Sequence, residues 1–250
     1  MSSPSGVLAA DKPLGWTSHD VVAVIRGASG IRRVGHGGTL DPLATGVLPI
    51  LVGPATKFVD RLHGASKVYA ALVRFGSETT TEDREGAVAR EAPVPAGVGD
   101  EDLRAFRGTI QQVPSGYSAI KVDGRRAYDR ARGGETLALE ARTITIERLA
   151  IAGWSAPDLR LLIVCSTGTY IRALARDLGR ALGSAAHLAG LRRLAVGALD
   201  AEGAAEVEAL RRGGPAAVLS ALREPDDRLL VLPERYRSDA AAALLAGWAP

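Results

Sequence analysis

The order of strand-like and helix-like segments is the feature that most constrains how this chain can fold. Period-2 patterning, as in 67–75, predicts strands, and apolar residues at helical spacing, as in 171–182, predict helices. The two kinds of segment follow one another irregularly, without the repeated strand–helix units that build a parallel sheet. The sequence therefore predicts an α+β fold. The other predicted strands are short and mostly apolar, at 6–10, 142–151 and 159–166.

Three helices can be placed from residues at their ends, two by capping residues and one by the turn that precedes it. Ser18 can cap a helix that carries Asp20 in its first turn, with Gly27 and Gly30 at its end. Asp100 is expected to cap a short helix that ends at Gly108. A third helix is predicted directly after the polar turn at 167–170.

A glycine-rich segment, 35–46, surrounds a single aspartate, Asp41. Glycine allows positive φ and close approach of the backbone to a ligand, and Pro42 favours an extended conformation at Asp41. This arrangement suits presentation of a carboxylate, but an aspartate beside Gly and Pro also forms simple turns. The pattern alone favours the turn. The apolar run 47–52 that follows reads either as a strand or as the start of a buried helix.

Composition restricts the kind of site that the chain can carry. With one cysteine, Cys165, in 250 residues, neither an internal disulfide nor a zinc–cysteine cluster can form. A net charge of +3 and a pI of about 9.2 are compatible with a polyanionic partner and equally with a slightly basic protein that binds none. No signal peptide or membrane-spanning run is visible, so a cytoplasmic location is expected.

Six segments, in order, resemble motifs of the bacterial tRNA pseudouridine-55 synthase family. The most specific is Gly35-His-Gly-Gly-Thr-Leu-Asp-Pro-Leu-Ala-Thr-Gly-Val-Leu-Pro-Ile50, which resembles the catalytic motif of that family. The others begin at Asp11 (DKPLGWTS), Lys67 (KVY, followed by the polar loop 76–86), Tyr117 (YSAIK), Cys165 (CSTGTYIR) and Leu191 (LRRL). Together they cover roughly residues 6–200.

The resemblance implies a pseudouridine-synthase fold, with a mixed, largely antiparallel central sheet flanked by helices. It also implies isomerisation of uridine to pseudouridine at position 55 in the T-loop of tRNA, on a base flipped out of its stack. The matched catalytic residues are Asp41 as the nucleophile, Arg172 as its cationic partner and Tyr69 as the residue that stacks on the uracil. The reaction involves no redox change, so no cofactor and no metal is expected.

Further residues are matched to substrate contacts. His36, Tyr69, Tyr170 and Leu191 correspond to positions around the uracil, and Lys12 is grouped with them as a support of the catalytic loop. The resemblance implies an RNA-gripping insertion at about 115–142. The basic residues expected at the RNA backbone are Arg32, Arg33, Lys121, Arg125, Arg126 and Arg130.

The resemblance also suggests a division of the chain. Residues 6–200 are expected to form the catalytic domain, and 201–250 a helical C-terminal segment ending in a truncated RNA-binding appendage. The expected partner is the T-arm of tRNA, with no membrane, no obligatory protein partner and a monomeric state. Two glycines depart from the family pattern: Gly37 replaces Thr or Ala, which predicts a looser loop, and Gly190 stands where a larger residue is frequent.

Two other functions are compatible with the same motifs. One is that of the guide-RNA-dependent relatives that modify ribosomal RNA together with partner proteins. The other is a non-catalytic RNA-binding or RNA-folding protein that keeps the scaffold. The combination of Asp41, Tyr69 and Arg172 argues against the second, because a protein that only binds RNA has no need of all three.

Overall fold

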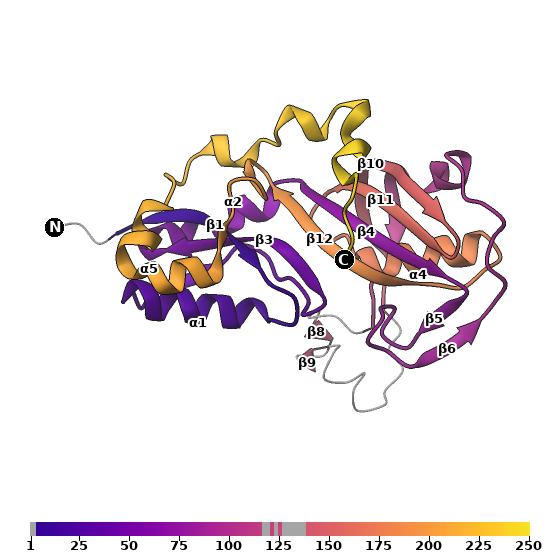
Figure 1. Ribbon diagram of the computed structural model, residues 1–250, viewed down its shortest axis with the longest axis horizontal. Helices are drawn as coiled ribbons and strands as arrows, with labels where there is room; N and C mark the ends of the chain where they lie inside the picture. Colours follow the sequence, from indigo (N-terminus) through magenta and orange to yellow (C-terminus); the bar gives the residue numbers. More distant parts are fainter. Residues whose placement is uncertain (1–3, 117–120, 123–124, 127–138) are drawn as a thin grey trace. The chain divides into compact units, whose positions relative to one another are not determined.

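The computed structural model describes residues 4–116, 121–122, 125–126 and 139–250, with the backbone alone described at 121–122 and 125–126. The chain divides into two compact units (Figure 1). The first unit comprises Met1–Ala70 and Leu191–Ala241, and the second comprises Ala71–Gly190 and Ala242–Pro250. Two long strands, β4 (Lys67–Phe75) and β12 (Ala186–Val196), contribute residues to both units.

The first unit contains a sheet in the order β14-β1-β3-β12-β4, with β2 added to β3 and β13 to β12. Its other strands are β1 (Gly6–Lys12), β2 (Val34–His36), β3 (Ala44–Val52), β13 (Leu199–Asp200) and β14 (Ala205–Glu206). Strand β1 runs antiparallel to β3, whereas β12 runs parallel to β3 and β14 parallel to β1. The run 47–52 is therefore a strand, and it is buried on both faces.

Both faces of this sheet are covered. Helices α1 (Ser18–Ser29) and α5 (Val207–Ser220) lie side by side and pack on the face that carries Leu8 and Ala10 (Figure 1). The opposite face, with Val7 and Ala9, packs against the helical turns η1 (Gly53–Phe58) and α2 (Val59–Gly64). Alternate residues of β1 thus enter two separate apolar cores, as the period-2 geometry of a strand requires.

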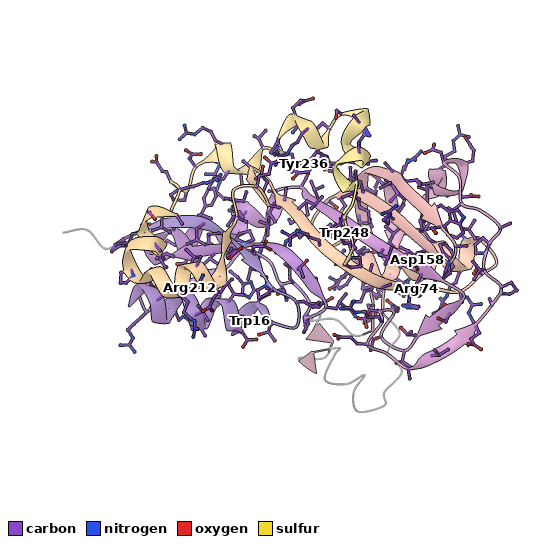
Figure 2. The ribbon with its side chains drawn as sticks, viewed as in Figure 1. Trp16, Arg74, Asp158, Arg212, Tyr236 and Trp248 are labelled. Carbon is purple, nitrogen blue, oxygen red and sulfur yellow. The ribbon has the colours of Figure 1, made fainter. Side chains whose placement is uncertain are left out.

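The second unit contains the order β12-β4-β11-β10-β7. Its elements are β5 (Ser77–Thr79), β6 (Val88–Glu91), η2 (Glu101–Phe106), β7 (Gly108–Gln112), β10 (Arg142–Ser155), β11 (Asp158–Cys165) and α4 (Ile171–Ala181). Strand β10 is antiparallel to both β7 and β11. Strands β4 and β11 are also joined by a bidentate ion pair in which both guanidinium–carboxylate distances between Arg74 and Asp158 are 2.8 Å (Figure 2).

The remaining elements are short. Strands β8 (Lys121–Val122) and β9 (Arg125–Arg126) form an antiparallel pair. Three helical turns, η3 (Asp227–Leu230), η4 (Glu234–Tyr236) and η5 (Asp239–Leu245), follow α5. No helix in the described part of the chain is long and apolar enough to cross a membrane.

The α+β prediction, with a mixed and largely antiparallel sheet flanked by helices, is confirmed. One capping prediction is wrong: Thr17, not Ser18, is the N-cap of α1, and it forms a capping box with Asp20. Asp100 does occupy the N-cap position of a short helix, which is 3₁₀, but its side chain does not cap the helix and pairs with Arg107 instead. Strands β7 and β12 were not predicted.

Candidate active site

The segment that joins β2 to β3, residues 37–43, is here called the aspartate loop, and it belongs to the first unit. Asp41 is half-buried in it, and Pro42 is exposed. The Ala44 amide donates to the Asp41 carbonyl at 3.0 Å, which closes a turn directly before β3. The turn expected from the sequence therefore exists, and it places Asp41 at the entrance of a buried strand.

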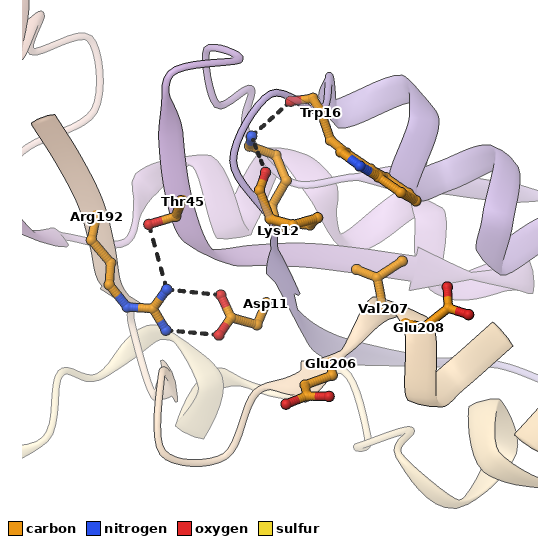
Figure 3. Close-up of a pocket in the computed structure, with 9 residues that line it drawn as sticks. Asp11, Lys12, Trp16, Thr45, Arg192, Glu206, Val207 and Glu208 are labelled. Carbon is orange, nitrogen blue, oxygen red and sulfur yellow. Dashed lines mark hydrogen bonds and ion pairs between the residues drawn. The ribbon is translucent and has the colours of Figure 1, made fainter. Parts of the chain in front are cut away.

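Lys12, the last residue of β1, supports the far side of this turn. Its fully buried ammonium donates to the carbonyls of Trp16 at 2.7 Å and Pro13 at 3.0 Å (Figure 3). It also donates to the Pro42 carbonyl, at 3.4 Å. The Gly15 amide also donates to the Pro42 carbonyl, at 2.8 Å. Burial lowers the pKa of Lys12 from 10.5 to about 8, and the charge of Asp41 opposes that shift. Through its bond to Pro42, Lys12 contacts the backbone of the aspartate loop one residue after Asp41.

The lowered pKa of Lys12 predicts a pH dependence of stability. Between pH 8 and 10.5 the unfolded chain keeps the Lys12 proton while the folded chain releases it. Lys12 therefore makes the free energy of unfolding increase with pH in this window, by up to about 1.4 kcal/mol per pH unit. We expect urea denaturation of the wild type from pH 7.5 to 9.5 to show this slope, and Lys12→Met to lack it. Equal slopes for both proteins would contradict the assignment.

Ser18 holds the middle of the aspartate loop. Its buried hydroxyl accepts from the Leu40 amide at 2.9 Å and lies 3.2 Å from the Leu40 carbonyl, to which it donates. Because Thr17 supplies the cap of α1, the Ser18 side chain is available for this second task. The first turn of α1 thereby fixes the residue that precedes Asp41.

A cavity of about 280 Å³ lies beside Lys12 in the first unit (Figure 3). At one end Arg192 of β12 forms a bidentate pair with Asp11, at 2.7 and 3.0 Å, and lies 3.4 Å from the Thr45 hydroxyl. Arg192, in the middle of β12, therefore links that strand to the end of β1 and the start of β3, next to the aspartate loop. The lining residues are Asp11, Lys12, Pro13, Trp16, Thr45, Arg192, Glu206, Val207 and Glu208.

His36 precedes the aspartate loop on β2. Its ring lies edge-to-face with that of His19, with centroids 5.8 Å apart. Nδ1 of His36 is buried and has no hydrogen-bond partner among the residues that the structure describes. Burial lowers the pKa of His36, so the neutral imidazole is favoured at neutral pH.

Tyr69 and Leu191 also belong to the first unit. Tyr69 is half-buried on β4, and Leu191 is 8% exposed on β12. The Leu191 backbone is in register with Ala44, three residues after Asp41. Parallel pairing of β12 with β3 thus places Leu191 beside the end of the aspartate loop.

Tyr170 and Arg172 lie at the start of α4, in the second unit. The side-chain amide of Gln112, which is buried, bonds both backbone groups of Tyr170: the Tyr170 amide donates at 2.9 Å and its carbonyl accepts at 3.1 Å. Gln112 therefore takes the place of a capping side chain, since none caps α4.

Arg172 is buried in the first turn of α4, where a cation opposes the helix dipole. One guanidinium nitrogen, Nη1, lies 3.2 Å from the Thr81 carbonyl, 3.3 Å from the Ser115 hydroxyl and 3.7 Å from the Asp83 carboxylate. Asp83 in turn accepts from Thr81 at 2.6 Å and from the Glu85 amide at 3.0 Å. The loop after β5 thus orients Arg172 and compensates part of its charge.

The predicted site residues therefore fall into two groups. Asp41, His36, Lys12, Tyr69 and Leu191 belong to the first unit, and Tyr170 and Arg172 to the second. Arg32 and Arg33 are exposed before β2, and Arg33 donates to Thr56 at 2.6 Å. Lys121, Arg125 and Arg126 lie on β8 and β9, where only the backbone is described, and Arg130 lies outside the described residues.

Three supporting residues were not predicted from the sequence: Ser18, Gln112 and Asp83. Each acts on a segment at least 22 positions away, because Ser18 bonds Leu40, Gln112 bonds Tyr170 and Asp83 faces Arg172. Residue type and local spacing carry no signal for such partners.

Sequence comparison identifies relatives over most of the chain. The family model described as TruB family pseudouridylate synthase (N terminal domain) matches residues 26–171, and that of the tRNA pseudouridylate synthase B C-terminal domain matches residues 172–224. A tRNA pseudouridine synthase B from Leifsonia xyli is 45% identical over 98% of this chain and 85% of its own length. One from Thermobifida fusca is 48% identical over 82% of this chain and 74% of its own length.

Solved structures with the same fold include a chain of a Cbf5-Nop10-Gar1 complex, with a TM-score of 0.67 and 29% identity. The match covers 88% of this chain and 60% of that one. A chain in a structure of an H/ACA RNP bound to a substrate RNA containing 2′-deoxyuridine matches with a TM-score of 0.61 and 27% identity, over 97% of this chain and 67% of that one. These likenesses confirm the predicted pseudouridine-synthase fold.

Proposed function

This chain belongs to the TruB family of pseudouridylate synthases, and from that premise we propose that it isomerises uridine 55 in the T-loop of tRNA, with Asp41 as the nucleophile. The observation that carries the proposal is the placement of Asp41. Its carboxylate stands on a turn whose backbone is bonded on both sides, by Ser18 at Leu40 and by Lys12 at Pro42. Such a turn presents one acid in a fixed position, as covalent catalysis needs.

The chemistry explains why a carboxylate is enough. The reaction breaks the bond between N1 of uracil and C1′ of ribose, turns the base over and joins C5 to C1′. The C5 proton leaves and N1 gains a proton, so atoms and electrons balance without an external oxidant or reductant. A covalent bond from Asp41 to the sugar or the base retains the separated fragments while the base rotates.

The other site residues act on the uracil and on Asp41. Tyr69 stacks on the flipped base, and Tyr170 and Leu191 line its pocket, offsetting the few kcal/mol that unstacking costs. In this proposal Arg172 pairs with the Asp41 carboxylate in addition to the Asp83 carboxylate, which lies 3.7 Å from it. A guanidinium can serve both, because it carries five N–H donors. His36 contacts the substrate as a neutral imidazole.

RNA binding depends on phosphate contacts by basic side chains. Arg32 and Arg33 are exposed directly before β2 and can reach an RNA backbone. We assign the same task to Lys121, Arg125, Arg126 and Arg130 in the insertion at about 115–142. The proposal includes action on the T-arm in the cytoplasm, as a monomer without an obligatory protein partner. In this proposal residues 6–200 form the catalytic domain, and residues 201–250 form a helical C-terminal segment that ends in an RNA-binding appendage.

One observation favours a second function. The fold is similar to a chain of a Cbf5-Nop10-Gar1 complex and to a chain of an H/ACA RNP bound to a substrate RNA, which suggests a synthase that works together with partner proteins. Sequence identity weighs against this alternative, because it is 29% to the chain of the Cbf5-Nop10-Gar1 complex and 45–48% to the tRNA pseudouridine synthases B. The tRNA substrate is therefore the better supported one.

A single assay separates the two functions. We expect the purified chain alone to convert the uridine of a T-arm hairpin RNA that corresponds to position 55, with product mapped by chemical labelling of pseudouridine. A hairpin with cytidine at that position serves as the control and should gain no label. Absence of product without added proteins and guide RNA would overturn the proposal.

A further inference from the structure

Arg193 is the most deeply buried cation of the first unit apart from Lys12. It is 2% exposed on β12, next to Arg192, whose side chain instead pairs with Asp11. Burying a guanidinium costs several kcal/mol unless its donors are satisfied. The hydrogen-bond partners of the Arg193 guanidinium therefore matter for the stability of its surroundings.

The partners of Arg193 among the described residues are three backbone carbonyls. Nη2 donates to Gly38 at 3.0 Å, Nη1 lies 3.3 Å from the Thr39 carbonyl, and Nε donates to Val47 at 2.7 Å. Gly38 and Thr39 precede Asp41 in the aspartate loop, and Val47 follows it on β3. One side chain therefore joins the two ends of the segment that carries Asp41.

With Arg193 included, backbone groups along almost the whole aspartate loop are held. Arg193 holds Gly38 and Thr39, Ser18 holds Leu40, and Lys12 contacts Pro42. The three carbonyls that accept from Arg193 lie on two different segments, so a rigid planar guanidinium with several donors is required there. An ammonium at the end of a flexible chain cannot reproduce that geometry.

We propose that Arg193 is a positioning residue for Asp41, acting through the backbone of the aspartate loop. This inference rests on the proposed role of Asp41. The side chains of Arg192 and Arg193 leave opposite faces of β12, because they are neighbours on a strand. The proposed role therefore belongs to Arg193 and not to Arg192. Loss of the guanidinium releases residues 38 and 39, and Asp41 then samples unproductive positions.

The test compares Arg193→Lys and Arg193→Met with the control Arg212→Lys, at an exposed arginine on α5 of the same unit, in the full chain. Single-turnover rates and Kd are measured on the T-arm hairpin, together with hydrogen exchange of the peptide that covers 37–43. A displacement of about 1 Å at a reacting group costs on the order of 10²-fold in rate, so we expect Arg193→Lys to be about 10- to 100-fold slower. Kd should stay within about twofold, since the phosphate contacts that dominate RNA affinity are untouched.

Three further results are expected. Amides of 38–40 exchange faster in Arg193→Lys, catalysis by Arg193→Met is slower than by Arg193→Lys, and Arg212→Lys stays close to the wild type in both rate and exchange. If Arg193→Met does not fold, Arg193→Lys decides. A folded Arg193→Lys with the wild-type rate and exchange would overturn the inference, as would a loss confined to Kd or an equal loss in Arg212→Lys.

The failure of this inference differs from the failure of the proposed function. If Asp41→Asn is inactive and Arg193→Lys is normal, Asp41 remains the nucleophile and Arg193 has no positioning role. If Asp41→Asn is active, the proposed function falls, and hydrogen exchange still reports whether Arg193 orders the loop.

Discussion

Replacing Asp41 by Asn is expected to abolish pseudouridine formation while leaving tRNA affinity nearly unchanged. Asn has the same shape and keeps the Asp41 carbonyl bonded to the Ala44 amide, so the turn should persist. A neutral amide cannot form the covalent intermediate, and removal of a covalent nucleophile costs at least about 10⁴-fold in rate. Chemical labelling of pseudouridine in tRNA, together with a filter-binding Kd, measures both quantities.

A matched control for this variant is Asp60→Asn. Asp60 is an exposed carboxylate of the same unit, in the first turn of α2, and its replacement removes the same charge. We expect it to retain the wild-type rate. Normal turnover by Asp41→Asn, or an equal loss in Asp60→Asn, would contradict the role of Asp41.

The second large effect is expected for Gly46→Ala, on stability. Gly46 has φ of 99°, and a Cβ built on it would lie 2.2 Å from the Arg193 carbonyl on β12. The backbone cannot yield without opening the parallel pairing of β3 with β12, in which Gly46 faces Arg193. Strain at positive φ alone costs about 1–3 kcal/mol, and the clash adds to it, so we expect a loss of at least about 3 kcal/mol or failure to fold.

Gly35→Ala provides the comparison in the same motif. Gly35 does not have positive φ, and a Cβ at this position would meet no atom within 4 Å. Its free energy of unfolding, from urea titration, should change by no more than about 0.5 kcal/mol. Similar values for the two variants would show that the contact between β3 and β12 does not require glycine at 46.

The two glycines that depart from the family pattern are both packed. The Gly37 amide donates to Pro49 at 2.8 Å, and a Cβ there would lie 3.2 Å from side-chain atoms of Leu62 and Pro49. A Cβ on Gly190 would meet Pro250 at 2.2 Å. Neighbouring side chains therefore lie close to where a larger residue would stand at each position. The looser loop expected for Gly37 stays a prediction.

Local patterns predicted the strands well where one face or both faces are apolar. The segment 67–75 is strand β4 with the predicted bounds, because every second residue from Tyr69 to Phe75 is apolar and forms one continuous face. Strand β12 was missed because Arg192 and Arg193 interrupt its apolar run, and charged residues normally indicate an exposed segment. Capping was misassigned at Ser18 for a related reason, since Thr17 and Ser18 are both good N-caps and only the position of Leu40 separates their roles.

The turn at Asp41 and the fold class follow from residue patterns, because glycine, proline and period-2 alternation act over a few residues. The family follows from six motifs in order along the chain. Which side chains hold the aspartate loop became visible only in the folded structure. Arg193 lies 146 residues from Val47, and its charge predicts exposure until three carbonyls are seen to satisfy its donors. A backbone carbonyl that accepts a hydrogen bond cannot be predicted from residue type, because every residue carries a carbonyl. The fold alone determines which carbonyls lie beside a buried cation.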